Sequence, residues 1–209
     1  MLNIICFGDS ITEGDDVDKP ERWTSILQAR LNKDFPEGYR VINKGIGGNT
    51  SAQGFDRFCD DVLPYLPGLL LVEFGFNDAN VKDWSIEPRV SLEEFVRNLR
   101  EFHRIALANN SSCVFILNHT IADVDGKQGN GLTYNENLLA YDKAVIELAT
   151  ELDTRTINLP GRMAASDINL DTFLSDDNIH LSEAGNKHYA QMVFDVIIEN
   201  NFYQPRLVK

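Results

Sequence analysis

Apolar and polar positions along the chain form two repeating patterns, which predict strands and amphipathic helices in alternation. Five short apolar runs, rich in β-branched and aromatic residues and bounded by turn residues, predict strands. These runs lie at residues 2–7, 39–43, 69–74, 113–117 and 154–158. The run at 69–74 is the most apolar, which predicts a central strand with both faces covered.

Between the apolar runs, hydrophobic residues recur at three- and four-residue spacing, as they do along one face of a helix. Thr50, Ser91 and Thr133 are each followed three residues later by Gln or Glu, which is the spacing of a capping box. We therefore expect helices to begin at these three residues and near Pro20. A last helix is expected to bury apolar residues between positions 189 and 197.

Strands that alternate with crossover helices predict a parallel sheet with helices on both faces. We expect an α/β fold, a three-layer α/β/α sandwich with a flavodoxin-like, doubly wound parallel sheet of about five strands. The 209 residues contain no repeat, linker or low-complexity tract, so one domain over residues 1–209 is expected.

The net charge of −13 argues against nucleic acid or an anionic membrane as a partner, because the field of the protein repels phosphate. No apolar run approaches the ~20 residues that span a bilayer, so stable membrane association is not expected. Acidic residues cluster beyond the first strand at positions 15, 16, 18 and 21, which favours a small neutral or cationic substrate over a polyanion. The oligomeric state stays open.

Cys6, Cys59 and Cys113 lack the spacing of a metal site and are expected to be buried thiols in a reducing compartment. The first predicted strand begins almost at Met1, without a basic and then apolar leader. A cytoplasmic location is therefore expected, although a secreted chain already trimmed of its signal would look the same.

Ser10 follows the first predicted strand in the segment Gly8-Asp9-Ser10-Ile11. A serine where a strand gives way to a helix has an accessible hydroxyl and an unpaired backbone N–H, which suits a nucleophile. The alternative is a serine that only caps a helix or forms a turn. Gly48 and Asn77 follow the second and third predicted strands, so all three should meet at the carboxyl edge of the sheet.

A serine hydroxyl needs a base to accept its proton, and the base needs a partner that fixes its tautomer. His180 and Asp177 have suitable spacing, with an ion pair at a helix start as the alternative. The Ser10 N–H, the Gly48 N–H and the Asn77 side-chain amide are candidate donors of an oxyanion hole. A plain turn at Gly48 and an Asx-turn at Asn77 are the alternatives.

Four short blocks give the chain a resemblance to the GDSL or SGNH hydrolase family. They appear in order at residues 8–11, 47–50, 75–78 and 177–180. The resemblance implies that Ser10 is the nucleophile, that Gly48 and Asn77 donate to the oxyanion, that His180 is the base and that Asp177 orients it. Ile11 stands where the family name has leucine, which is a conservative apolar exchange.

The resemblance implies a serine esterase that cleaves carboxylic esters through an acyl-enzyme, and it implies no cofactor and no metal. We expect short acyl chains, such as acetyl esters of carbohydrates or other small alcohols, because no long exposed apolar segment suits a lipid tail. A lysophospholipase or thioesterase of the same family is the alternative. From other classes, the alternatives are a catalytically idle binding module and a nucleotide or flavin binder that uses Gly45-Ile46-Gly47.

Asp9, Phe76 and Trp84 are candidate substrate-binding residues. Phe76 and Trp84 lie near Asn77 in the sequence and suit an acyl or alcohol pocket, with ordinary packing as the alternative. Asp9 also suits a role in organising its loop, because Asp177 has the better spacing to His180. His119 follows the fourth predicted strand and is expected to be a solvated residue of a long polar loop over 118–133.

Overall fold

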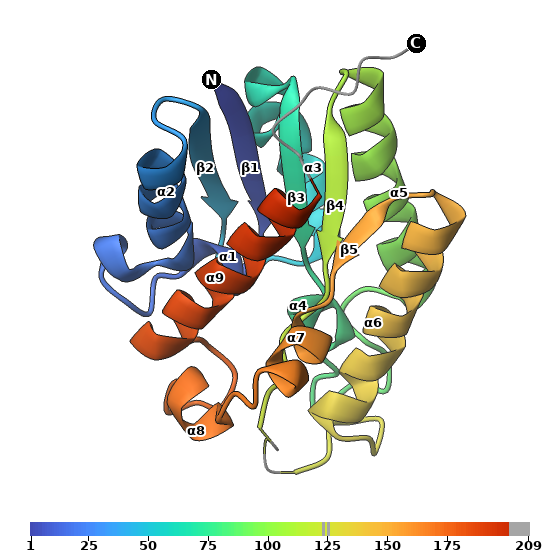
Figure 1. Ribbon diagram of the computed structural model, residues 1–209. Helices are drawn as coiled ribbons and strands as arrows, with labels where there is room; N and C mark the ends of the chain where they lie inside the picture. The colour runs from blue at the N-terminus through green and yellow to red at the C-terminus, as the bar shows by residue number, and fades with distance from the viewer. Residues whose placement is uncertain (123, 125, 201–209) are drawn as a thin grey trace.

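A parallel sheet organises the chain, whose computed structural model describes residues 1–122, 124 and 126–200. Within these residues the strands lie in the order β2-β1-β3-β4-β5, with every neighbouring pair parallel (Figure 1). Their bounds are Leu2–Gly8 for β1, Tyr39–Gly45 for β2, Gly68–Glu73 for β3, Ser112–Ile116 for β4 and Arg155–Ile157 for β5. This order confirms the expected flavodoxin-like, doubly wound sheet. Residues 201–209 of the expected single domain lie outside the described residues.

Helices cover both faces of the sheet, which makes the three expected layers. On one face α2 (Trp23–Asp34) packs against α9 (Glu183–Glu199), which crosses in front of the strands in Figure 1. On the other face α5 (Leu92–Ala108) packs against both α3 (Ser51–Asp61) and α6 (Tyr134–Glu151). Shorter helices are α1 (Ser10–Glu13), α4 (Phe76–Ala79), α7 (Leu159–Ala165) and α8 (Leu170–Phe173).

The predicted helix starts are confirmed with one shift. Thr50 and Thr133 form reciprocal capping boxes, and the Ser91 side chain accepts a hydrogen bond from the Glu94 N–H. The helix expected near Pro20 begins at Trp23 instead, after a short 3₁₀ turn over Lys19–Glu21. Its start is fixed by a tertiary contact, because the Trp23 N–H donates to Asn186 Oδ1 of α9 at 2.8 Å.

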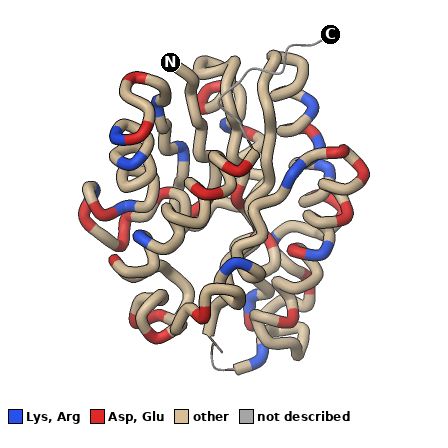
Figure 2. The backbone as a smooth tube through the Cα atoms, in the orientation of Figure 1, with Lys and Arg blue, Asp and Glu red and all other residues tan. Residues whose placement is uncertain are grey.

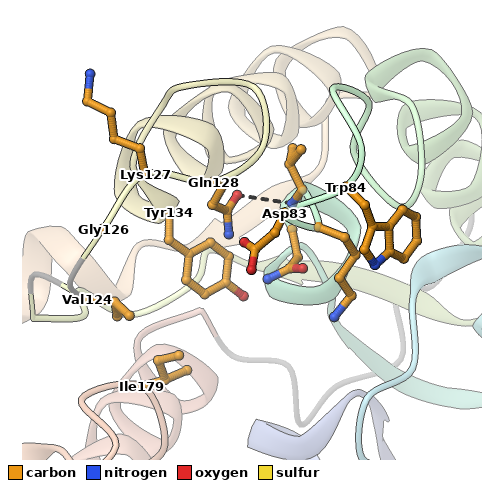
Figure 3. A pocket seen from close by; sticks show the side chains of 11 residues that line it. Asp83, Trp84, Val124, Gly126, Lys127, Gln128, Tyr134 and Ile179 are labelled. Atoms are coloured by element: carbon orange, nitrogen blue, oxygen red, sulfur yellow. Dashed lines mark hydrogen bonds between the residues drawn. The ribbon is translucent and has the colours of Figure 1, made fainter.

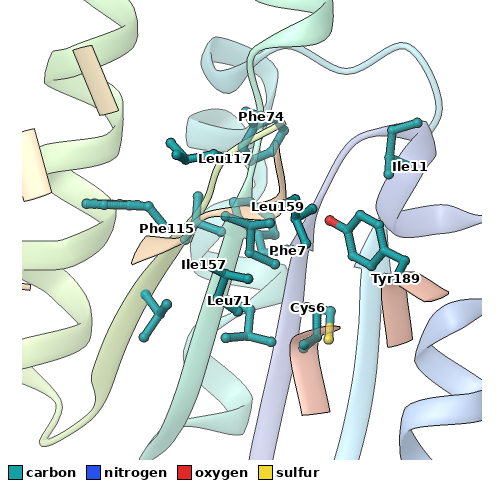
Figure 4. Close-up of a cluster of buried hydrophobic side chains, with 14 of the residues drawn as sticks. Cys6, Phe7, Ile11, Leu71, Phe74, Phe115, Leu117, Ile157, Leu159 and Tyr189 are labelled. Carbon is teal, nitrogen blue, oxygen red and sulfur yellow. The ribbon is translucent and has the colours of Figure 1, made fainter. Parts of the chain in front are cut away.

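Aromatic side chains fill much of the core between the sheet and its helices. Phe102 of α5 stacks on Phe58 with ring centroids 5.0 Å apart and meets Phe7 edge-on at 5.4 Å. Cys6 precedes Phe7 on β1 and so points to the opposite face, where Tyr189 of α9 lies in Figure 4. Cys6 and Cys113 are buried as expected, but Cys59 is exposed because it lies on the solvent side of α3.

The register of the strands aligns the loops that follow them. Gly8 pairs with Gly45 on β2 and with Glu73 on β3, so the next residues of all three strands emerge at one edge. A Cβ at Gly8 would lie 2.3 Å from Thr12 Oγ1 and 2.5 Å from the Glu73 carbonyl oxygen. Glycine is required there because the chain turns from β1 into α1 directly against β3.

Replacing Phe102 by alanine should lower the free energy of unfolding by about 3–5 kcal/mol. The truncated side chain would leave a cavity where several neighbouring rings now pack against Phe102. Leu107→Ala on the same helix is the matched control, since Leu107 is 54% exposed. Its effect should stay within about 0.5 kcal/mol. Urea unfolding followed by circular dichroism measures both values, and equal losses would contradict this description of the core.

Candidate active site

The structure brings Ser10, His180 and Asp177 into one hydrogen-bonded chain. Ser10 Oγ lies 2.8 Å from His180 Nε2, and His180 Nδ1 lies 2.5 Å from Asp177 Oδ2. Ser10 is the first residue of α1 at the carboxyl edge of the sheet, and the other two residues lie on the loop before α9. One ring nitrogen therefore faces the carboxylate while the other faces the hydroxyl, which is the arrangement that makes a serine nucleophilic.

Asp177 also shapes the loop that carries His180. Its Oδ1 atom accepts hydrogen bonds from the backbone N–H groups of Ile179 at 2.9 Å and His180 at 2.8 Å, and from the Ser175 hydroxyl at 2.9 Å. Partial burial raises the pKa of Asp177, but the hydrogen bonds from His180, Ile179 and Ser175 outweigh it and hold that pKa well below its ordinary value. The pair lies in the loop before α9, whose N-cap is Ser182, so neither residue caps that helix.

His119 supports the same loop from beneath. Its ring is 1% exposed, and Nε2 lies 2.8 Å from the carbonyl oxygen of Ile179, the residue before His180. Burial lowers the pKa of His119 to about 4, so the ring is neutral near pH 7 and Nε2 donates its proton to the carbonyl. The expectation of a solvated loop residue is wrong, because Phe76 and Phe173 pack around the ring.

The three predicted oxyanion donors follow β1, β2 and β3, as expected. Gly48 has a φ of 72°, a conformation that glycine adopts without strain, and its N–H makes no hydrogen bond to another described residue. A Cβ at Gly47 would lie only 4.0 Å from Ser10 Cβ, so this turn borders the serine. Asn77 lies in α4 and donates from Nδ2 to Asp9 Oδ2 at 3.1 Å.

Asp9 lies beneath the site and does not face it. The residue is 0% exposed, and its Oδ1 caps α1 by accepting the Ile11 N–H at 3.0 Å. The expectation that Asp9 contacts substrate is therefore wrong, and the structure supports its role in organising the loop. Burial raises the pKa of Asp9 to about 6, against the opposing effect of the hydrogen bonds from Ile11 and Asn77.

Sequence reasoning missed Glu73, the last residue of β3. Its side chain is buried next to Asp9, and its Oε2 accepts a hydrogen bond from the Thr12 hydroxyl at 2.9 Å. Burial, and then the charge of Asp9, raise the pKa of Glu73 well above its ordinary value. The signal in the sequence was a lone carboxylate within the most apolar predicted strand, since such groups are rarely buried without a partner.

Asp78, in the sequence block at residues 75–78, makes hydrogen bonds to Ser51, which directly follows the block at residues 47–50. Its carboxylate accepts hydrogen bonds from the Ser51 N–H at 2.9 Å and from the Ser51 hydroxyl at 2.5 Å, at the start of α3. Asn98 of α5 donates to the same hydroxyl at 3.1 Å. The loop that holds Gly48 is therefore attached through α3 to the residue after Asn77.

The two aromatic candidates for substrate binding lie in different surroundings. Phe76 is buried against His119, and its carbonyl accepts a hydrogen bond from the Tyr134 hydroxyl at 2.7 Å, so the packing alternative holds for it. Trp84 is 85% exposed and borders a cavity of about 380 Å³. Its candidacy stays a prediction.

The cavity adjoins the serine site without containing it. Its lining combines segment 80–84 with Val124, Gly126, Lys127, Gln128, Tyr134 and Ile179. In Figure 3 the side chains of Gln128 and Tyr134 face this space, whereas that of Lys127 points away from it. Ile179 is the neighbour of His180, and a small depression of about 10 Å³ lies at Ser10 and His180 themselves. The loop over 118–133 thus helps to shape the site, although residues 123 and 125 lie outside the described residues.

Basic and acidic residues are mixed along the described part of the chain. Figure 2 shows Lys and Arg interspersed among Asp and Glu over the described chain. Part of the acidic cluster beyond Ser10 is neutralised, because Arg22 pairs with Asp15. Across the described residues, no group of three or more His, Cys, Asp or Glu could hold a metal ion, and none of the helices there is long and apolar enough to cross a membrane.

Asp78 should make stability depend on pH. Burial raises the pKa of Asp78 from 3.8 to about 6, against the hydrogen bonds from Ser51, so the folded chain binds the proton more tightly than the unfolded chain. The contribution of Asp78 is therefore full below about pH 4 and is lost as the pH rises through 6. Relative to Asp78→Asn, the wild-type free energy of unfolding should fall by up to about 3 kcal/mol between pH 4 and pH 7.

Urea unfolding of both proteins at several pH values between 4 and 7 measures this difference. A difference that stays constant, or that favours the wild type more as the pH rises, would contradict the assignment.

Comparisons with known proteins agree with this geometry. The model of the GDSL-like lipase/acylhydrolase family matches residues 6–188. An uncharacterised lipoprotein, YqeF of Bacillus subtilis, is 37% identical over 107 residues, which is 48% of this chain and only 41% of that protein. The rat isoamyl acetate-hydrolyzing esterase 1 homolog (Rattus norvegicus) is 24% identical over 98% of this chain and 85% of its own.

Solved structures share the fold. The acetylxylan esterase Axe2 from Geobacillus stearothermophilus superimposes with a TM-score of 0.78 at 21% identity, over 94% of each chain. Because the Bacillus relative is a lipoprotein by name, the expected cytoplasmic location stays a prediction. The family match covers most of the chain, including the four sequence blocks and the residues assembled around Ser10. The chain therefore belongs to the GDSL-like lipase/acylhydrolase family.

Proposed function

We propose that this protein is a serine esterase that hydrolyses carboxylic esters through an acyl-enzyme on Ser10. The observation that carries the proposal is the pair of hydrogen bonds on His180, with Ser10 Oγ at 2.8 Å on one nitrogen and Asp177 Oδ2 at 2.5 Å on the other. Membership of an acylhydrolase family supports the same chemistry.

In the first step, Ser10 Oγ attacks the carbonyl carbon of the ester while His180 Nε2 accepts the hydroxyl proton. Asp177 stabilises the imidazolium that forms and keeps Nδ1 protonated. The carbonyl oxygen becomes an oxyanion, and we expect the Ser10 N–H, the Gly48 N–H and the second N–H of Asn77 Nδ2 to stabilise it by donating hydrogen bonds. Each such donor is typically worth 10²–10³-fold in rate, roughly.

In the second step, His180 returns its proton to the oxygen of the departing alcohol, and the carbon–oxygen bond breaks to leave the acyl group on Ser10. A water molecule then gives its proton to His180 and attacks the acyl carbon at the same position. The collapse of this second tetrahedral intermediate releases the carboxylic acid and restores the Ser10 hydroxyl.

The substrate that we propose is a small neutral ester with a short acyl group, such as an acetyl ester of a carbohydrate or another small alcohol. The cavity of about 380 Å³ is near the lower end of the usual range for small-molecule sites, which is roughly 300–1,000 Å³. Its lining mixes the aromatic Trp84 and Tyr134 with Lys82, Asp83 and Gln128, which suits a polar molecule better than a lipid tail. The rat and Geobacillus relatives are named for acetyl esters.

Replacing Ser10 by alanine should abolish hydrolysis of p-nitrophenyl acetate, with a loss of about 10⁴-fold or more in kcat, because the nucleophile is removed. A fluorophosphonate should label the wild type once per chain and leave the variant unlabelled. Ser112→Ala, at the opposite end of a strand, is the control for a serine without this role. Unchanged turnover in a folded Ser10→Ala protein would refute the assignment.

A series of p-nitrophenyl esters from acetate to dodecanoate should give the highest kcat/KM at roughly two to four acyl carbons. The methylene groups of longer acyl chains would extend beyond a cavity of this size and gain no binding energy there. Acetylated sugars, an acyl-CoA and a lysophospholipid complete the panel. A maximum at long acyl chains would overturn the short-chain proposal and favour the lysophospholipase or thioesterase alternative.

A further inference from the structure

Arg89 bridges two of the proposed oxyanion-hole residues with a single guanidinium group. Its Nη1 donates to Asn77 Oδ1 at 2.8 Å, and its Nη2 donates to the Gly48 carbonyl oxygen at 2.9 Å. Gly48 follows β2 and Asn77 follows β3, so the two hydrogen bonds connect loops that are separate in the sequence. A guanidinium group suits this bridge because its two Nη atoms hold their donors in fixed positions on one planar group.

The segment from residue 80 to residue 90 returns Arg89 to this place. It folds back on itself as a short hairpin, in which Val81 and Pro88 form an antiparallel bridge. The Arg89 N–H donates to the Asn80 carbonyl at 3.0 Å, and the Val90 N–H donates to the Asp78 carbonyl at 3.2 Å. The backbone on both sides of the arginine is therefore attached to the segment that carries Asn77.

Arg89 and Asp9 together determine which way the Asn77 amide faces. The amide oxygen accepts a hydrogen bond from the guanidinium of Arg89, and the amide nitrogen donates to Asp9 Oδ2 at 3.1 Å. A flipped amide would place its NH₂ group against the guanidinium and its oxygen against the carboxylate, which replaces two attractive contacts with two repulsive ones. Because the NH₂ group has two hydrogens, one remains for an oxyanion.

The turn at Gly47 and Gly48 is held by charged side chains at both ends. Glu13 Oε2 accepts the Gly47 N–H at 2.5 Å, while Arg89 donates to the Gly48 carbonyl. These two contacts restrain the peptide groups on either side of the Gly48 N–H. A turn of this kind, with glycine at a positive φ, would otherwise have wide conformational freedom.

From these contacts we infer that Arg89 is a positioning residue of the oxyanion hole, which holds the Asn77 amide and the Gly48 turn in the orientation that the transition state requires. The inference rests on the proposed esterase function. Arg89 acts before substrate arrives, by reducing the reorganisation that the donors would otherwise undergo during the reaction. Its side chain is exposed, so its removal leaves the buried core of the protein unchanged.

Arg89→Met should lower kcat for p-nitrophenyl acetate by about 10–100-fold with less than about a threefold change in KM, because transition-state stabilisation is lost rather than ground-state binding. Arg89→Lys should recover little of this loss, since an ammonium group lacks the two fixed, coplanar nitrogens that make these contacts. Arg97→Met is the matched control, because Arg97 is an exposed arginine on α5, paired only with Glu94 in the described structure. Its kcat should equal that of the wild type.

A double-mutant cycle separates this role from a general structural effect. If Arg89 acts through Asn77, then Arg89→Met should cost less in an Asn77→Ala background than in the wild type, because the amide that it orients is gone and only its contact with the Gly48 carbonyl remains. Equal costs in both backgrounds, or a raised KM with an unchanged kcat, would overturn the inference. If Arg89→Met keeps full activity while wild-type turnover depends on Ser10, the inference alone fails. If wild-type turnover does not depend on Ser10, both the inference and the esterase proposal fail.

Discussion

The buried carboxylate of Asp9 is the contact on which the arrangement of the site depends. Asp9 follows β1, caps the helix that begins with Ser10 and accepts a hydrogen bond from Asn77. A carboxylate that is removed from water is costly unless hydrogen bonds surround it, so each partner is held strongly in place. Both the serine and one proposed oxyanion donor therefore take their positions from the same buried charge.

The neighbours of Asp9 show how this burial is tolerated. Glu73 lies beside it with a pKa raised well above the ordinary value by burial and by the charge of Asp9, which favours a neutral Glu73 and one negative charge on the pair. Asp78 forms a third buried acid near the same edge, and the two donors of Ser51 compensate it. Buried carboxylates are thus concentrated at the carboxyl edge of the sheet, while the aromatic core between the sheet and its helices supplies stability.

Much of the fold could be predicted from the sequence because its signals are local. Apolar runs and capping boxes depend on residues a few positions apart, and the confirmed strands and the starts of α3, α5 and α6 are of this kind. The start of α2 could not be placed, because Asn186 of α9 supplies its cap from 163 positions away. The short helices α7 and α8 lie in sequence without a clear apolar period, and no expectation covered them.

In the candidate site, too, residues with a local sequence signal could be predicted, whereas those placed by tertiary packing could not. Four short sequence blocks mark the candidates for the site, because each block is recognisable from a few adjacent residues. These candidates are Ser10, Gly48, Asn77, Asp177 and His180. The burial of Asp9 and His119 and the position of Arg89 follow only from tertiary packing. Asp9 is covered by Glu73 from another strand, and His119 faces a loop about 60 residues further along the chain. Sequence alone could therefore identify the reacting groups more readily than the residues that orient them.

The 80–90 hairpin lies next to both the cavity and the proposed oxyanion donors. Trp84 near its tip borders the cavity, and Arg89 at its base bridges Gly48 and Asn77. The triad is attached elsewhere, to β1 and to the loop before α9. The same hairpin therefore borders the proposed substrate cavity at one end and contacts the proposed oxyanion donors at the other. The cavity is therefore lined by segments outside the sheet, while Ser10 lies directly at the carboxyl edge of the sheet, which suits a design in which loops select the substrate and a rigid element holds the nucleophile.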